Sequence, residues 1–294
     1  MQKGEPSRTA LAAAVHRAAH QVLESGRIFA DPLAARILGG GEAAARLAER
    51  VAEDDPAHRR MRLFIAVRTR FAEDAAAAAC ARGARQVVVL GAGLDTYAYR
   101  APRRDGVRVF EVDHPATQAW KRERLAAAGI AAPEWLAFAP VDFEGQTLSE
   151  GLVAAGFEAA QQTFVTWLGV VPYLTEEAVW ATLRFVASLP GGAHVVFDYA
   201  DPPETLAPEM RQEYERRAAR VESLGEKWLT HFDPPALHAR LRAEGFREIE
   251  DLGPADIAAR YFPNRQGAAR ERGGHVLRAS TVGEGGTVAA GGER

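Results

Sequence analysis

From Gln86 onward, short apolar runs alternate with stretches of helical periodicity, and this alternation limits the folds open to the chain. Runs rich in β-branched residues, separated by helix-length segments, are typical of βαβ units in a parallel sheet. Strands are predicted at 86–90, 107–112, 135–139, 163–169, 194–199, 246–250 and 275–280. Helices are predicted between them, at 95–100, 115–128, 145–155, 175–188 and 233–244. The pattern therefore predicts an α/β fold with a doubly wound sheet.

The segment before Gln86 has helical spacing throughout. Apolar residues in 8–52 recur at helical intervals, and a longer helix is predicted over 56–83. The stretch 201–227 is polar, helical and poor in core residues, so we predict an insertion over the sheet and a candidate lid. We expect a single domain over 1–294. Its parts are predicted as a helical cap at 1–60, an α/β core at 61–200 and 228–281, and a disordered tail at 282–294.

Charge and cysteine content exclude several classes of function. The 294 residues carry 36 Lys and Arg against 39 Asp and Glu, so there is no basic footprint for nucleic acid. The single cysteine, Cys80, forms no internal disulfide and suits a reducing compartment. No apolar stretch approaches the roughly 18 residues of a membrane span, and no signal peptide is evident. The eight histidines lack metal-ligand spacing. We expect a cytoplasmic protein without a metal, acting on a small molecule.

The first predicted strand runs into a Gly-X-Gly turn, Gly91 to Gly93, where a backbone can approach a ligand closely. A dinucleotide-binding turn would have a third glycine where Thr96 stands, and Asp95 would repel a pyrophosphate. A ligand with positive charge and no phosphate suits Asp95 better, and S-adenosylmethionine is such a ligand. Alternatively, Asp95 only caps the following helix.

Carboxylates follow the next two predicted strands. Asp113 lies about 20 residues beyond the turn, the spacing at which an acid meets ribose hydroxyls. Asp142 lies at the carboxyl end of the third strand, where it could accept the adenine amino group with Phe143 against the ring. The alternatives are a helix cap for Asp113 and a turn for Asp142.

Helical periodicity places Arg68 on the same apolar face as Phe64 and Phe71, whereas Arg70 is turned toward solvent. An inward arginine needs a partner. The carboxylate of an amino-acid-like cofactor could provide it through a bidentate pair, and an internal ion pair with Asp or Glu is the alternative.

Eight motifs in this order resemble the bacterial branch of the leucine carboxyl methyltransferase family, across about Thr9 to Ala279. They are "TALAAAVHRAAH", "FADPLAARIL", "AVRTRFAED", "VVVLGAGLDTYAYR", "FEVDHPATQAWKRERL", "PVDFEG", "TWLGVVPYLTEEAV" and "ARYFPNRQG". The resemblance implies a class I methyltransferase fold, which is a Rossmann-like, mostly parallel seven-stranded sheet with one antiparallel strand and a helical cap.

The resemblance also implies a set of cofactor contacts. Arg68 would bind the carboxylate of S-adenosylmethionine, Gly91 would lie beneath its amino-acid part, and Asp113 would hold its ribose. Asp142 and Phe143 would frame the adenine. The product would be S-adenosylhomocysteine.

Two positions depart from the family pattern, Leu168 and His20, where many members have Glu. Both changes are predicted to lie near the pocket, so the acceptor of the founding members cannot be carried over. Candidate residues for the substrate side are Arg17, Trp167, Tyr173 and Tyr199, although core packing could explain each of them. No catalytic base stands out, which favours a carboxylate or another readily ionised oxygen as acceptor.

The leading hypothesis is an S-adenosylmethionine-dependent O-methyltransferase acting on a small-molecule carboxylate or hydroxyl. An NAD-dependent oxidoreductase would share the turn and the distal acid but lacks the third glycine. A regulatory protein that binds the cofactor without catalysis is the third possibility, because of Leu168 and His20.

Overall fold

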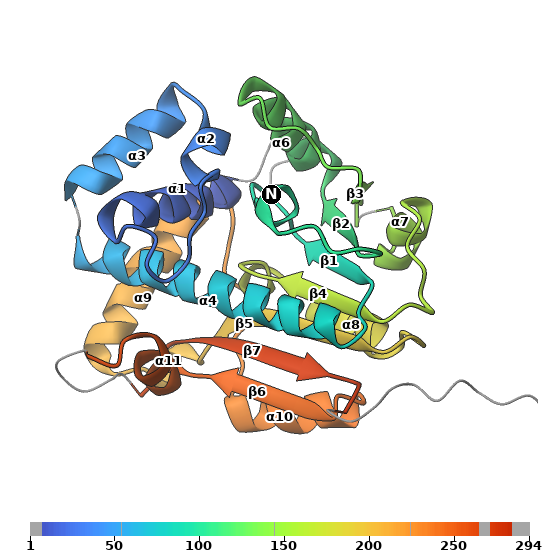
Figure 1. Cartoon of the computed structure of the whole chain (residues 1–294). Helices are drawn as coiled ribbons and strands as arrows, with labels where there is room; N and C mark the ends of the chain where they lie inside the picture. The colour runs from blue at the N-terminus through green and yellow to red at the C-terminus, as the bar shows by residue number, and fades with distance from the viewer. Residues whose placement is uncertain (1–7, 54, 144, 224, 265–270, 284–294) are drawn as a thin grey trace, which may run out of the picture.

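The computed structural model describes residues 8–53, 55–143, 145–223, 225–264 and 271–283, and its centre is a seven-stranded sheet (Figure 1). The strands are β1 (Gln86–Leu90), β2 (Arg108–Asp113), β3 (Leu136–Pro140), β4 (Thr163–Trp167), β5 (Ala193–Ala200), β6 (Glu248–Leu252) and β7 (Gly274–Ser280). Their order is β3-β2-β1-β4-β5-β7-β6, and only β7 runs antiparallel to its neighbours. The seven strands and the single antiparallel strand are therefore confirmed.

The helices begin where the sequence supplies caps. Proline follows the capping residue at Asp55, His114 and Asp233, and each of these side chains accepts a backbone N–H of the first turn. The α-helices are α1 (Arg8–Leu23), α2 (Ala34–Leu38), α3 (Glu42–Glu53), α4 (Pro56–Ala81), α5 (Tyr97–Arg100), α6 (Pro115–Ala127), α7 (Leu148–Ala154), α8 (Glu176–Ala187), α9 (Pro208–Ser223), α10 (Pro234–Ala243) and α11 (Pro254–Tyr261). Two 3-10 turns are η1 (Val171–Tyr173) and η2 (Pro203–Thr205).

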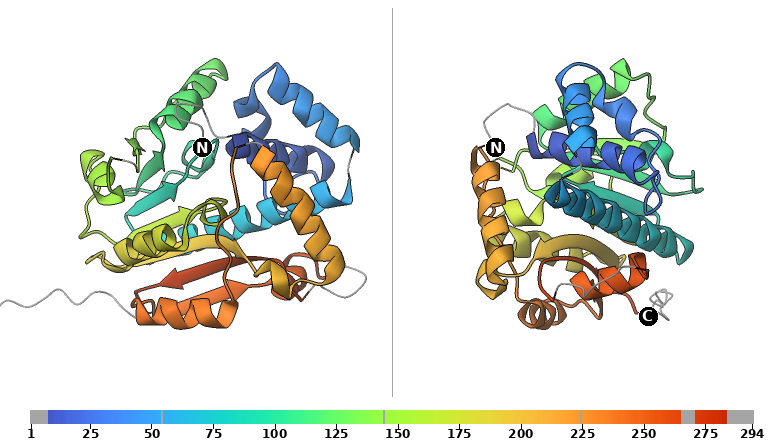
Figure 2. Two further views of the ribbon diagram at one scale, coloured as in Figure 1. Left: turned by 180° about the vertical axis from the view of Figure 1, so that it is seen from behind. Right: turned by 90° about the vertical axis from the view of Figure 1, so that its left-hand side faces the viewer.

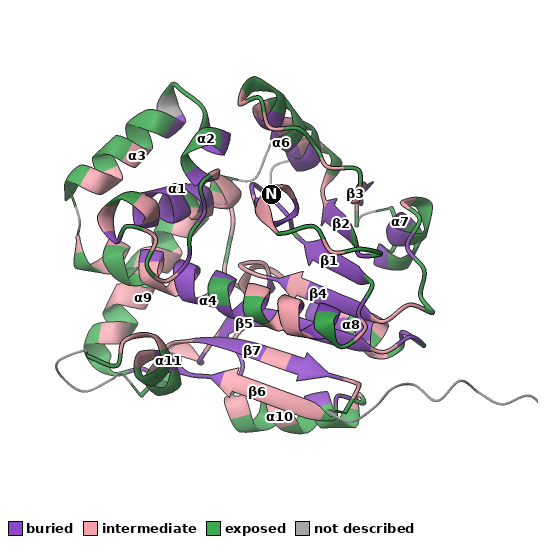
Figure 3. Cartoon of the chain, in the orientation of Figure 1, coloured by how far each residue is buried: buried purple, intermediate pink, exposed green. Residues whose placement is uncertain are grey.

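Alternate residues of the central strands pack on opposite faces of the sheet. In β1, Val88 and Leu90 join the core beneath α7, α8 and α10, whereas Val87 and Val89 join the core beneath α4 and α11. Helices cover both faces, as Figure 2 shows, and the central strands are buried (Figure 3). Sheets of this kind place ligands at the carboxyl ends of their parallel strands.

A smaller apolar cluster joins the N-terminal helices to the sheet. Residues of α1, α2 and α3 pack with Leu94, which follows the glycine turn, and with Leu125 of α6. The predicted cap thus lies against the turn after β1. The helix α4 begins in the predicted cap range and continues across the sheet, so it belongs to both parts.

Most differences from the predicted elements are at their ends. The strand predicted at 163–169 ends at Trp167, because Gly169 has a left-handed φ of +72°. The strand predicted at 246–250 starts two residues later, after Phe246 has packed into the core. In the insertion 201–227, α9 is the main element and has no buried residue. The predicted tail lies outside the described residues from 284 onward.

Candidate functional site

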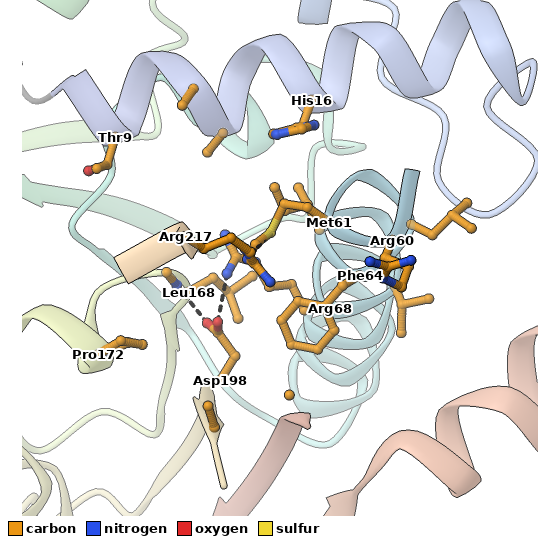
Figure 4. Close-up of a pocket in the computed structure, with 18 of the residues that line it drawn as sticks. Thr9, His16, Arg60, Met61, Phe64, Arg68, Leu168, Pro172, Asp198 and Arg217 are labelled. Carbon is orange, nitrogen blue, oxygen red and sulfur yellow. Dashed lines mark hydrogen bonds and ion pairs between the residues drawn. The ribbon is translucent and has the colours of Figure 1, made fainter. Parts of the chain in front are cut away.

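A cavity of about 2100 Å³ opens at the carboxyl ends of β1, β2, β4 and β5. Its lining comes from the turns after these strands and from α1, α4 and α9, which converge on it from the cap and from the insertion (Figure 4). A typical small-molecule site has about 300–1,000 Å³. The cavity is therefore large enough for two ligands side by side.

The glycine turn forms the floor of the cavity at β1. Gly91 and Gly93 have left-handed φ values of +65° and +42°. A Cβ on Gly91 would lie only 2.4 Å from the Cγ2 atom of Val170, so both the backbone conformation and the space require glycine there.

Asp113 closes the turn from the end of β2. Its Oδ2 accepts the Gly93 N–H at 2.6 Å, and its Oδ1 accepts the N–H of His114 at 2.7 Å. Burial raises the pKa of Asp113 above its usual value, although both backbone donors act in the opposite direction. His114, not Asp113, caps α6. Asp113 thus lines the cavity with a fixed carboxylate.

Arg68 points inward, as its periodicity predicts, and its side chain is only 12% exposed. Its Nη1 lies 2.6 Å from Oδ2 of Asp198 at the end of β5, and Asp198 also accepts the Gly169 N–H. Figure 4 shows this pair at the edge of the cavity. The alternative considered for Arg68, an internal ion pair with an aspartate or glutamate, is therefore present. The Nε of Arg68 is buried without a hydrogen-bond partner among the described residues.

Arg70 is the solvent-facing counterpart on the same helix. Its side chain is 51% exposed and pairs with Asp74 one turn later, at 2.7 Å. The expected difference between the two arginines is confirmed.

Arg17 of the cap contacts the turn after β1. Arg17 of α1 donates to the carbonyl of Leu94 at 2.6 Å and lies 3.3 Å from Asp31. Asp95 accepts the N–H of Tyr97, the first residue of the short α5, but the N-cap residue of that helix is Thr96 and not Asp95. Both Arg17 and Asp95 also line the cavity.

Among the substrate-side candidates, the prediction that Trp167 lines the pocket was wrong. Thr166 and Leu168 line the cavity, whereas Trp167 points to the other face of β4 and is buried in the core against Phe197. Alternation along the strand is the reason, because neighbouring side chains point to opposite faces.

Both tyrosine candidates line the cavity. Tyr199 has little freedom, since its hydroxyl donates to Asp251 and its ring stacks on His275. Burial raises the pKa of Tyr173, although a side-chain hydrogen bond from Trp228 opposes the shift.

Two cofactor candidates, Asp142 and Phe143, and one departure from the family pattern, His20, lie outside the cavity. The backbone turns at Asp142, whose carbonyl accepts the N–H groups of Gly145 and Gln146, and the Phe143 side chain is 64% exposed. Neither residue lines the cavity. His20 is also absent from the lining, because it is buried against Glu24 at 3.0 Å. Leu168, the other departure from the family pattern, does line it.

Sequence reasoning missed Asp198 and the contribution of the insertion. Asp198 could have been found as an acid near the carboxyl end of an otherwise apolar strand. The insertion contacts the cap through an ion pair between Arg60 and Glu213, at 2.5 Å, and a hydrogen bond from Thr9 to Glu226, at 2.8 Å. Such contacts between distant segments leave no local signal.

No cluster of metal-ligating side chains occurs among the residues that the structure describes. Over the same residues, no helix is both long and apolar enough to cross a membrane.

The model of the leucine carboxyl methyltransferase family matches residues 10–187, more than half of the chain. The chain belongs to this family. A protein of Bacillus subtilis (strain 168), provisionally named the S-adenosyl-L-methionine-dependent methyltransferase YktD, is 36% identical over 186 residues, covering 63% of this chain and 61% of that protein. A relative from Saccharopolyspora erythraea with the same provisional activity is 38% identical over 172 residues, covering 58% of each chain. The match thus spans about 60% of the length of these family relatives.

The fold is shared with solved structures. A provisionally named methyltransferase from Thermobifida fusca YX superposes with a TM-score of 0.56 at 19% identity, covering 95% of this chain and 96% of that one. With the strand order above, this identifies the class I methyltransferase fold that family members were expected to have.

Proposed function

We propose that the chain is an S-adenosyl-L-methionine-dependent methyltransferase that methylates an oxygen of a small-molecule carboxylate or hydroxyl. The observation that carries this proposal is the convergence of three features on one cavity. These are the Gly91–Gly93 turn, the carboxylate of Asp113 and the Arg68–Asp198 pair. Family membership and the provisional names of the relatives support it.

The residues at the cavity fit this cofactor. Each oxygen of Asp113 accepts one backbone N–H and retains a second lone pair, which can accept a ribose hydroxyl. Arg68 uses Nη1 for Asp198 and keeps donors, including its buried Nε, for a carboxylate. The positive φ at Gly91 and Gly93 lets backbone rather than side chains face the amino-acid part.

When bound, the cofactor supplies a methyl group on a positively charged sulfur, which an oxygen nucleophile takes up in line as the carbon–sulfur bond breaks. The protein's task is then to align the acceptor and exclude water. An ionised carboxylate needs no base, whereas a hydroxyl needs one to take its proton. The excess volume of the cavity leaves room for the acceptor beside the cofactor.

Calorimetry with S-adenosylmethionine and S-adenosylhomocysteine tests cofactor binding. Asp113→Ala and Arg68→Ala should each weaken binding by roughly 1–3 kcal/mol, because each removes a charged hydrogen-bond partner. Arg70→Ala is the matched control, since Arg70 lies on the same helix but outside the cavity. Unchanged affinity in both cavity variants would show that the cofactor site is misplaced.

Transfer of a labelled methyl group to a panel of carboxylic acids and phenols tests the reaction. A thermal shift with NAD but none with S-adenosylmethionine would instead favour an oxidoreductase. Binding of S-adenosylmethionine without transfer to any acceptor would favour a regulatory protein.

A further inference from the structure

The cavity has the opposite charge balance from the chain as a whole. Among the described residues, 13 arginine or lysine side chains line it against eight aspartate or glutamate side chains, whereas the whole chain has a net charge of −3. Much of the positive charge is on the cap and insertion side, away from Asp113 and Asp198.

His16 of α1 lies within this positive side. It is only 8% exposed, and its Nδ1 is buried without a hydrogen-bond partner in the part of the chain that the structure describes. In Figure 4 its ring extends from α1 toward the cavity, with Arg217 of α9 on the facing side. A buried polar atom without a partner is costly, so a ligand that pairs with it is favoured.

Several basic groups around His16 disfavour its protonation. Burial, followed by the charges of Arg50, His58, Arg62 and Arg217, lowers the pKa of His16 from its usual value to about 3. His16 is therefore a neutral imidazole that can carry its proton on Nδ1 and donate it.

The arginines of this wall come from two separate elements. Arg50 is on α3, and Arg217 and Arg220 are on α9. Among the described residues, the Nε of Arg50 is buried without a hydrogen-bond partner. After burial, the largest influence lowering the pKa of Arg50 is Arg220. Arg50 and Arg220 both line the cavity, and their like charges repel each other.

Several acids also lie near this wall. Glu213 pairs with Arg60, and Glu24 pairs with the buried Arg62 at 2.7 Å. Glu49 and Glu53 lie on the same helix as Arg50 and are exposed to solvent, where their charges are screened. Because 13 basic side chains line the cavity against eight acidic ones, an anion inside it would bring the lining closer to neutrality.

We propose that the methyl acceptor carries an oxyanion, a carboxylate or a phosphate, which binds against His16, Arg50, Arg217 and Arg220. Guanidinium groups hold such oxyanions through paired, charge-assisted hydrogen bonds, and the His16 N–H adds a donor. The identity of this ligand as the acceptor rests on the proposed function. The inference that an anion binds at this wall depends only on the residues that form the wall.

The test compares pairs of probes that differ in charge alone. Calorimetry measures 4-hydroxybenzoate against 4-hydroxybenzamide, together with phenyl phosphate and inorganic phosphate, with and without saturating S-adenosylhomocysteine. The acid should bind about tenfold more tightly than the amide, and added salt should reduce the difference. Whichever of 4-hydroxybenzoate and phenyl phosphate binds more tightly identifies the oxyanion as a carboxylate or a phosphate.

Variants locate the site. Arg50→Gln and Arg217→Gln should each reduce the preference for the acid severalfold, whereas Arg70→Gln, with the same change of charge on the outer face of α4, should keep it. His16→Leu should weaken binding of the acid, and His16→Asn should recover part of the loss because it retains a donor. Affinity for S-adenosylhomocysteine should stay constant in all of them.

Equal binding of acid and amide, no binding of any charged probe, or an unchanged preference in both arginine variants would overturn the proposal. Absence of S-adenosylhomocysteine binding would overturn the proposed function instead. Because the probes are also measured without it, the anion site is judged separately.

Discussion

Replacing Gly91 by alanine should destabilise the fold far more than the same change at a glycine of equal backbone conformation. At Gly91, φ is +65° and a Cβ would lie 2.4 Å from the Cγ2 of Val170. At Gly129, φ is +62° but nothing lies within 4 Å of a Cβ. The left-handed conformation costs an L-residue about 1–2 kcal/mol, and this is all that Gly129→Ala should lose. Overpacking adds about 1–3 kcal/mol at Gly91, so Gly91→Ala should lose about 2–5 kcal/mol.

Val170→Ala separates the two contributions. It removes the clashing methyl group and leaves a contact of 3.6 Å to the Cβ of residue 170, which is ordinary packing. In the double variant Gly91→Ala, Val170→Ala, the loss should therefore be smaller than the sum of the single losses by about 1–3 kcal/mol.

Urea denaturation followed by circular dichroism measures these losses, provided that the slope of the transition is the same in every variant. Equal losses for Gly91→Ala and Gly129→Ala would contradict the steric reasoning. Strict additivity with Val170→Ala would do so too.

The remaining predictions concern charged groups in and beside the cavity. Asp198→Asn leaves Arg68 without its carboxylate in a site where the two side chains are only 12% and 5% exposed, and it should cost about 3 kcal/mol of unfolding free energy in urea titrations. Asp74→Asn breaks the exposed pair with Arg70 and should cost less than about 1 kcal/mol, so similar losses would be inconsistent with the burial argument. Burial opposes protonation of His275, but hydrogen bonds to Asp201 and Asp251 outweigh it and raise the pKa of His275 to about 9. The stabilisation from protonated His275 should thus be complete below pH 6.5 and lost as the pH rises through about 9. The difference in stability between wild type and His275→Gln should shrink by about 3 kcal/mol over that interval, and a difference independent of pH would rule this out.

The sequence alone determined the order of elements, the glycine turn and the direction of Arg68. These features depend on neighbours within one element or turn, because helical and strand periodicities and the need for glycine at positive φ act over a few residues. Seven strands could therefore be predicted, with errors mainly at their ends.

Only the tertiary structure decided which of these residues meet at the cavity. Asp198 pairs with Arg68 across 130 positions of the chain, and α9 brings Arg217 opposite His16. Trp167 shows the limit of local reasoning. Strands buried on both faces are apolar on both, so the pattern in the sequence does not say which face meets the cavity. That choice depends on the helices that cover each face, and they come from distant parts of the chain.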